Sequence, residues 1–136
     1  MGMSRHALKA KKQLEAYKSA FMRMMRAKEQ IERLKSQLLK SPTLSGMPQG
    51  NTKHDLSDYA ANLEKLIEAE RQTIETEGAK MRTAKDLIEQ LVGIDNAILS
   101  YRYIDFMTFT DIAIKLNLTS NAVYIRHQRA LERLKV

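Results

Sequence analysis

A segment rich in proline and glycine separates two long stretches of this chain that contain no proline. Both prolines and two of the five glycines lie between residues 41 and 53, in the sequence SPTLSGMPQGNTK. Proline removes a backbone donor and glycine costs conformational entropy in any regular element, so this segment predicts a loop. Two long helices joined by such a loop fold back on each other and bury their apolar sides together.

Apolar and small residues follow a helical period on both sides of the predicted loop. They recur at spacings of three and four from Ser4 to Lys40, and again after Asp55 or Ser57, either of which can cap a second helix. The stripe consists of Ala7, Ala10, Leu14, Tyr17, Phe21, Met24, Ile31, Leu34 and Leu38, then Tyr59, Leu63, Leu66, Ile67, Ile74, Met81, Ala84, Ile88 and Leu91. Residues 1–92 are therefore predicted to form an antiparallel coiled-coil hairpin with its loop at 41–53.

Charge favours the pairing of these two helices. Residues 4–40 carry eleven basic and three acidic side chains, net +8, whereas residues 54–92 carry nine acidic and five basic ones, net −4. Lys28, Glu70 and Glu77 face the stripe, which predicts local flexibility or a Lys-Glu pair across the seam. The basic helix is either a solvated face matched to its partner or a surface that contacts phosphates, and both can hold at once.

From Gly93 onward, short apolar clusters replace the long stripe, and the local signals predict three short helices. The first runs from about Ile94 to Ile104 with one apolar face, made of Ala97, Ile98, Tyr101 and Ile104. Thr108 is placed to cap the second, with Asp111 three residues later, and Asn117 stands where that helix must leave right-handed geometry. Thr119 restarts a helix as its cap, Leu118 folds back onto the core, and small Ala113 lies inside the crossing.

The last helix is predicted to have a buried and a DNA-reading face, which makes residues 93–136 a helix-turn-helix module. Its buried residues are Val123, Ala130, Leu131 and Leu134. The candidate DNA-binding residues are Ser120, Asn121, Tyr124, Ile125, Arg126, Gln128 and Arg129, with Arg133 near the same face. Amide side chains pair with adenine, arginine with guanine, and apolar groups with the thymine methyl. The alternative is a plain three-helix cluster with a solvated face, although adjacent exposed Tyr124 and Ile125 favour a binding surface.

The run AILSYRYIDFMTFTDIAIKLNLTSNAVYIRHQRALERL resembles region 4 of bacterial sigma factors. The resemblance lies in YRYI, in FTDIAIKLNLT, and in the pattern that ends with Val123, Ala130, Leu131 and Leu134. The chain departs from it at Asn117, which replaces a usual glycine, and at His127, which replaces a frequent leucine and is expected to be a half-buried core residue. The absence of a sigma region 2 implies that the chain does not melt a promoter by itself.

The whole chain, with its SGMPQG loop, is similar to small phage and prophage proteins in which a coiled-coil hairpin precedes such a module. Those proteins in turn resemble the ArpU-type and RinA-type phage regulators of late gene expression. The resemblance implies a phage or prophage transcription regulator that binds double-stranded DNA, with Ser120, Asn121 and Tyr124 at base-reading positions. The hairpin would form a homodimer or higher homo-oligomer, or contact RNA polymerase. The alternatives are a DNA-packaging protein of the terminase small-subunit kind and a helical protein-interaction module.

Several other classes of function lack support in the sequence. Cysteine is absent, and His6, His54 and His127 have no metal-ligand spacing, so neither a metal site nor another cofactor is expected. No phosphate-binding glycine loop or catalytic triad occurs, and Asp95, Asp105 and Asp111 are spaced as helix-end residues, which argues against an enzyme. No apolar run has the length of a membrane span, and the start lacks a signal peptide, so we expect a soluble protein in the cytoplasm of a bacterial host.

Overall fold

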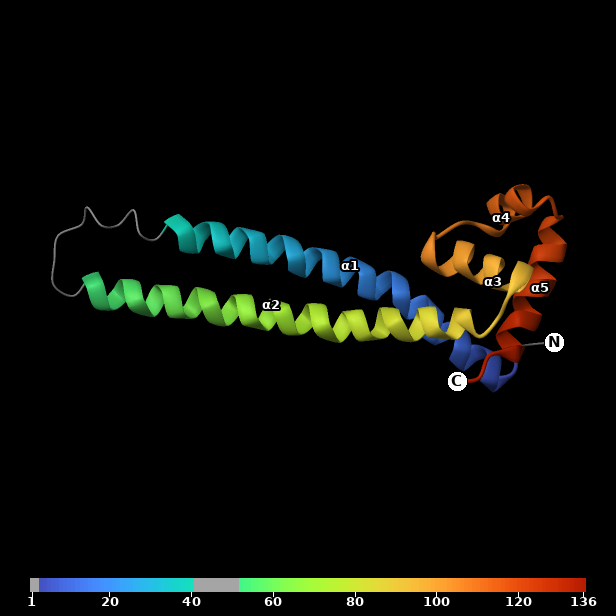
Figure 1. Cartoon of the computed structure of the whole chain (residues 1–136), viewed down its shortest axis with the longest axis horizontal. Helices are drawn as coiled ribbons and strands as arrows, with labels where there is room; N and C mark the ends of the chain where they lie inside the picture. Colours follow the sequence, from blue (N-terminus) through green and yellow to red (C-terminus); the bar gives the residue numbers. More distant parts are fainter. Residues whose placement is uncertain (1–2, 41–51) are drawn as a thin grey trace. The chain divides into compact units, whose positions relative to one another are not determined.

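The structure is a computed structural model that describes residues 3–40 and 52–136, and the regular elements of these residues are all helices (Figure 1). In chain order they are α1 (Arg5–Lys40), α2 (Thr52–Glu89), α3 (Gly93–Leu99), the π-helical segment η2 (Ser100–Ile104), α4 (Phe109–Leu116) and α5 (Ser120–Arg133). The predicted all-α class is confirmed, because two long helices pack together and a C-terminal helical module follows them. Within the described residues, no helix is long and apolar enough to cross a membrane.

The ends of the two long helices differ in how well they were predicted. α1 begins where expected, because the Ser4 hydroxyl oxygen accepts a hydrogen bond from the Ala7 amide at 3.1 Å. α2 begins at Thr52, so the prediction that Asp55 or Ser57 caps it is wrong. An acidic residue is favourable anywhere in the first turn of a helix, and it therefore does not mark the first residue. The remainder of the predicted loop, residues 41–51, lies outside the described residues.

The chain forms two compact units, Met1–Phe21 with Gly78–Val136, and Met22–Glu77. Each unit contains part of both long helices. The start of α1 shares a unit with the end of α2, and the end of α1 packs on the start of α2, so the two helices run antiparallel. The boundary predicted between residues 92 and 93 rests on composition and stays a prediction, as does the coiled-coil character of the pair.

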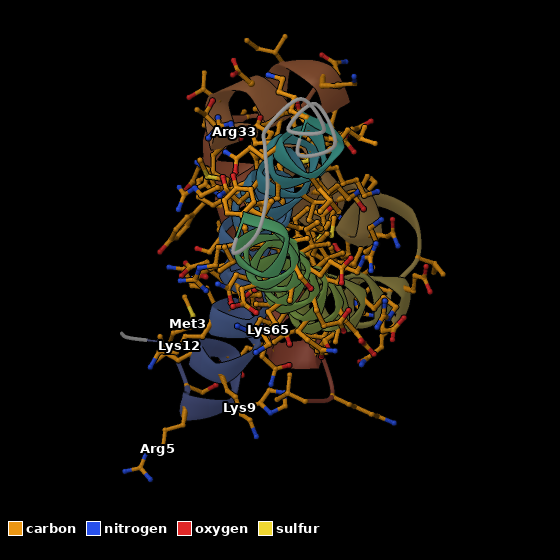
Figure 2. The ribbon with its side chains drawn as sticks, turned by 90° about the vertical axis from the view of Figure 1, so that its left-hand side faces the viewer. Met3, Arg5, Lys9, Lys12, Arg33 and Lys65 are labelled. Atoms are coloured by element: carbon orange, nitrogen blue, oxygen red, sulfur yellow. The ribbon has the colours of Figure 1, made fainter. Side chains whose placement is uncertain are left out.

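In the unit Met22–Glu77, α1 and α2 bury a small apolar core. It consists of Ile31, Leu34, Leu63 and Ile67, with Leu38 and Ile74 packed against it. Charged side chains lie outside this core, as the exposed Arg33 and Lys65 illustrate (Figure 2). The charge pattern and the apolar stripe thus agree on which sides of the helices meet.

Two predicted details of the stripe are wrong. Ala27 is buried and Lys28 is exposed, because a stripe that steps alternately by three and four passes through Ala27 and leaves Lys28 about 100° away from it. Tyr59 and Leu66 are also exposed, since each stands one residue before the position that the stripe occupies. Helical spacing in the sequence therefore does not distinguish Lys28, Tyr59 and Leu66, which lie beside the stripe, from its buried members.

The acidic residues of the predicted seam do face the partner helix. Glu77 is buried and Glu70 is half-buried. A guanidinium nitrogen of Arg23 lies 3.7 Å from a carboxylate oxygen of Glu77. An ion pair between the two helices is therefore present as predicted, but an arginine supplies the positive charge in place of Lys28.

The unit Met1–Phe21 with Gly78–Val136 joins the start of α1 and the end of α2 to the C-terminal module. Its larger core is shared by α1, α2, α3, η2 and α5, and it contains Ala7, Ala10, Leu14, Tyr17, Ala84, Leu87, Ile88, Leu91, Leu99, Tyr103, Ala130, Leu131 and Leu134. Burial of apolar surface on this scale is the main force that holds such a unit together. The module is thus built on the first turns of α1 and the last turns of α2.

The connection from α2 to α3 and the end of α3 carry the irregular geometry of this unit. Gly93 has φ +70°, a value that glycine adopts without strain, and it reverses the chain between the two helices. The predicted helix 94–104 is α-helical only to Leu99 and continues as the wider turn of η2. Leu99 from α3 and Tyr103 from η2 both lie in the larger core. Ala97, Tyr101 and Ile104, expected on the apolar face, are half-buried.

Candidate nucleic-acid interface

The starts of α4 and α5 and the turn between them have the local geometry that the sequence predicts. The Thr108 hydroxyl oxygen accepts from the Asp111 amide, and the Thr119 hydroxyl oxygen accepts from the Ala122 amide, each at 3.1 Å. Asn117 has left-handed geometry with φ 55° and ψ 45° and ends α4. The predicted caps and the predicted left-handed residue are therefore confirmed.

Another apolar core, separate from the two described above, holds α4 and α5 against α3. Ile98, Ile112, Ala113 and Val123 are buried in it, and Leu116 and Leu118 pack against it. Ala113 lies in this core, where its small side chain lets the helices approach closely. The three-residue turn Asn117–Thr119 and this core together form the predicted helix-turn-helix.

α5 has one buried and one exposed face. Val123, His127, Ala130 and Leu131 are buried along it, followed by Leu134. Ser120, Asn121, Ile125 and Arg129 are exposed, and their side chains make no ion pair or hydrogen bond within the part of the chain that the structure describes. We call these four residues the outer face of α5. It presents one amide, one hydroxyl, one apolar group and one guanidinium group to solvent.

Two other predicted site residues lie at the edge of this face and contact the module. The ring of Tyr124 meets the ring of Phe109 edge-on, with centroids 6.0 Å apart. The Gln128 amide nitrogen donates to the Tyr124 hydroxyl oxygen at 3.2 Å. Both side chains line a cavity of about 310 Å³ against α1 and η2. Tyr124 is therefore positioned by its neighbours, whereas the outer face is not.

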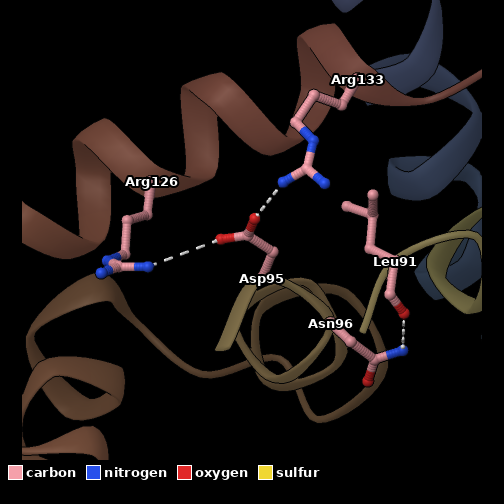
Figure 3. A network of polar contacts seen from close by, with 5 residues as sticks. All are labelled: Leu91, Asp95, Asn96, Arg126 and Arg133. Carbon is pink, nitrogen blue, oxygen red and sulfur yellow. Dashed lines mark hydrogen bonds and ion pairs between the residues drawn. The ribbon is translucent and has the colours of Figure 1, made fainter. Parts of the chain in front are cut away.

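Arg126 differs from the other predicted site residues because an acidic side chain holds it. A carboxylate oxygen of Asp95 lies 2.6 Å from Arg133, and the other lies 4.0 Å from Arg126 (Figure 3). Asp95 stands in the first turn of α3, where a carboxylate is also favoured by the helix dipole. Spacing along the chain predicts only a helix-end role for Asp95, because its partners Arg126 and Arg133 lie far along the chain.

The neighbouring Asn96 ties α3 to the end of α2. Its side-chain amide donates to the carbonyl oxygen of Ile88 at 3.1 Å. It also donates to the carbonyl oxygen of Leu91 at 2.9 Å, the contact that Figure 3 shows. The Ile88 carbonyl belongs to the last turn of α2 and Leu91 follows two residues after the helix ends, where intrahelical donors run out. Asp95 and Asn96 thus connect α3 to α5 and to α2, respectively.

His127 is more deeply buried than expected, with 2% of its surface exposed. Its Nε2 lies 2.6 Å from the Tyr103 hydroxyl oxygen, and its ring packs on the rings of Tyr103 and Phe109. Burial, with smaller contributions from Arg102 and Lys11, lowers the pKa of His127 from 6.5 to about 4. Burial also raises the pKa of Tyr103, so the phenol keeps its proton. His127 is therefore a neutral core residue.

Within residues 3–40 and 52–136, no three His, Cys, Asp or Glu side chains lie close enough together to hold a metal ion. The outer face of α5 exposes several polar groups together. The arrangement fits the recognition of a molecular surface better than the binding of a small cofactor.

Comparison with known proteins agrees with this geometry. Residues 82–134 match the family model described as sigma-70, region 4. No curated protein and no solved structure matches the chain. The matched residues begin at Arg82 in the last turns of α2, earlier than the resemblance read from the sequence, which begins at Ala97. The C-terminal module is thus a helix-turn-helix similar to region 4 of the sigma-70 factors.

Proposed function

We propose that this chain is a sequence-specific transcription regulator that reads duplex DNA with α5. The observation that carries the proposal is the outer face of α5 on a helix-turn-helix similar to sigma region 4. Its Asn121, Ile125 and Arg129 are exposed and have no ion-pair or hydrogen-bond partner among the described residues. In such modules, the second helix enters the major groove with its N-terminal residues on the base edges. α5 is the helix in that position.

The chemistry of the outer face fits the edges of base pairs. Asn121 can bind the N6 and N7 atoms of adenine in a bidentate manner, and Arg129 can bind O6 and N7 of guanine or a phosphate. Ile125 offers an apolar contact for a thymine methyl. The backbone amides at the start of α5 that the Thr119 cap does not bind can add a site for a phosphate oxygen. These groups specify a base sequence better than a uniform basic surface does.

The biological setting that we propose is phage or prophage transcription. The support for this setting is the resemblance read from the sequence, which implies a likeness to ArpU-type and RinA-type regulators. In this proposal, the long helices α1 and α2 supply self-association or a contact with RNA polymerase. A dimer would predict two half-sites that are separated by whole turns of the DNA helix.

The proposal is tested by selecting bound fragments from random duplex DNA and measuring affinity for the selected duplex and a scrambled one. The Asn121→Ala variant should lose roughly 5- to 150-fold in affinity for the selected duplex, about 1 to 3 kcal/mol for one bidentate contact. Asn62→Ala, the same change at an exposed position of α2, serves as the matched control.

Two results would count against the proposal. If no sequence is enriched, or if Asn121→Ala and Asn62→Ala bind the selected duplex equally well, α5 does not read bases. Sizing of the complex supplies the second result, since a ring-sized assembly would favour a packaging role over transcription.

A further inference from the structure

Most cations of the C-terminal module are engaged inside it. Residues 93–136 contain six basic side chains, namely Arg102, Lys115, Arg126, Arg129, Arg133 and Lys135. Arg102 stacks on Phe109 and donates to a backbone carbonyl, and Lys115 lies 5.1 Å from the centre of the Tyr101 ring. Asp95 holds Arg126 and Arg133. The module therefore has few cations to offer to a phosphate backbone.

The first turns of α1 lie beside the C-terminal end of α5. The Ser4 hydroxyl donates to the Glu132 carboxylate, at 2.7 Å from each oxygen. The His6 ring contacts the Leu134 carbonyl oxygen, and Ala7, Ala10 and Leu14 share the larger core with α5. Figure 1 shows the blue start of α1 next to the red end of α5. The two segments belong to one compact unit.

These turns of α1 carry exposed cations that no carboxylate of the described residues holds. Arg5, Lys9 and Lys12 are exposed and make no ion pair within the described residues, whereas Lys11 lies 3.7 Å from Glu15. Their spacing of four and three puts the three side chains on one face of the helix. Figure 2 shows them extending away from the ribbon at the same end of α1. We call Arg5, Lys9 and Lys12 the cationic face of α1.

We propose that the cationic face of α1 binds phosphates of the same duplex that α5 reads. The inference rests on the proposed function, and it assigns backbone binding to a helix outside the segment that matches sigma region 4. Glu132 is the single acidic residue of α5, and its carboxylate is bound to Ser4 at the junction of the two helices. The Ser4–Glu132 contact thus places the first turn of α1, with Arg5, beside the C-terminal end of α5.

The proposal predicts how DNA affinity depends on salt. Each phosphate that a cation neutralises adds about 0.9 to the slope of log affinity against log salt concentration. Loss of all three contacts therefore lowers the slope by about 2 to 3. Because phosphates carry no sequence information, affinity for the selected and the scrambled duplex should fall by the same factor.

The experiment replaces Arg5, Lys9 and Lys12 together by Gln in the full chain. The matched control replaces Lys28, Arg33 and Lys35, which are three exposed cations of α1 in the unit Met22–Glu77. Glutamine has a helix propensity close to those of lysine and arginine, so both triple variants keep α1 intact. Circular dichroism and thermal unfolding verify this before binding is measured between 50 and 200 mM salt.

The slope and the sequence preference separate the two proposals. A lower slope for the first variant only, with an unchanged ratio between the two duplexes, supports the cationic face. Equal slopes for the two triple variants overturn it, whatever Asn121→Ala does. If the wild type shows no preference between duplexes but the first variant still lowers the slope, the proposed function fails and the phosphate contact stands.

Discussion

Protonation of the buried His127 should destabilise the fold in mildly acidic solution. In the native state, its pKa is lowered to about 4, whereas an exposed histidine in the unfolded chain keeps a pKa near 6.5. Between pH 6.5 and pH 4, His127 binds a proton in the unfolded chain but not in the native state. The free energy of unfolding therefore falls as the pH drops from about 6.5 to about 4.

The size of this effect follows from the difference between the two pKa values. Each pH unit within the window costs about 1.4 kcal/mol, so the full difference corresponds to about 3 kcal/mol and the part between pH 7 and pH 5 to about 2 kcal/mol. A loss of about 2 kcal/mol is a considerable share of the stability of a small domain. The effect is therefore large enough to measure by chemical denaturation.

The assay compares the wild type with His127→Gln, which keeps a polar partner for the Tyr103 hydroxyl and does not titrate. Urea unfolding at pH 7, 6 and 5 should show the wild type losing about 2 kcal/mol more than the variant, because the carboxylates titrate in both and cancel. The same replacement at the exposed His6 controls for the loss of an imidazole as such. Identical pH dependence in wild type and His127→Gln would refute the reasoning.

Three further outcomes follow from the geometry of the module. Asp95→Asn should lower the free energy of unfolding by about 1 kcal/mol. Because it releases Arg126 and Arg133, it should also raise the slope of log DNA affinity against log salt concentration by up to about 2. An unchanged slope contradicts this. Asn117→Ala should lower stability by about 1 kcal/mol whereas Asn117→Gly preserves or raises it, which thermal unfolding checks; equal melting temperatures would be inconsistent with the left-handed geometry. Thr108→Ala should cost about 1 kcal/mol in urea unfolding and Thr108→Ser much less, unless the cap contributes nothing.

Features that depend on a few neighbouring residues could be predicted from the sequence. Thr108 and Thr119 accept hydrogen bonds from amides three residues ahead, and Asn117 takes a conformation that its own short side chain tolerates. Such interactions are complete within one turn of chain. A single sequence therefore contains all the information that they need.

Features that depend on partners far along the chain could not be predicted in this way. Arg126 and Arg129 differ by three positions on the same helix, but only Arg126 faces Asp95, and the packing of α3 on α5 decides this. The contact between Ser4 and Glu132 spans almost the whole chain. Charge counts along the sequence describe how many cations exist, but only the fold shows which of them stay exposed for a ligand.

The position at which the match to sigma region 4 begins bears on where the module begins. Composition changes at Gly93, but Ala84, Leu87 and Ile88 from the end of α2 pack with Leu99 and Leu131 in one core. A chain that began at residue 93 would expose that core on the side of α2. The matched segment starts at Arg82 and retains these contacts, yet it still lacks the first turns of α1. Because Ala7, Ala10 and Leu14 complete the same core, the helix that we propose to bind phosphates is also a structural part of the module that reads bases.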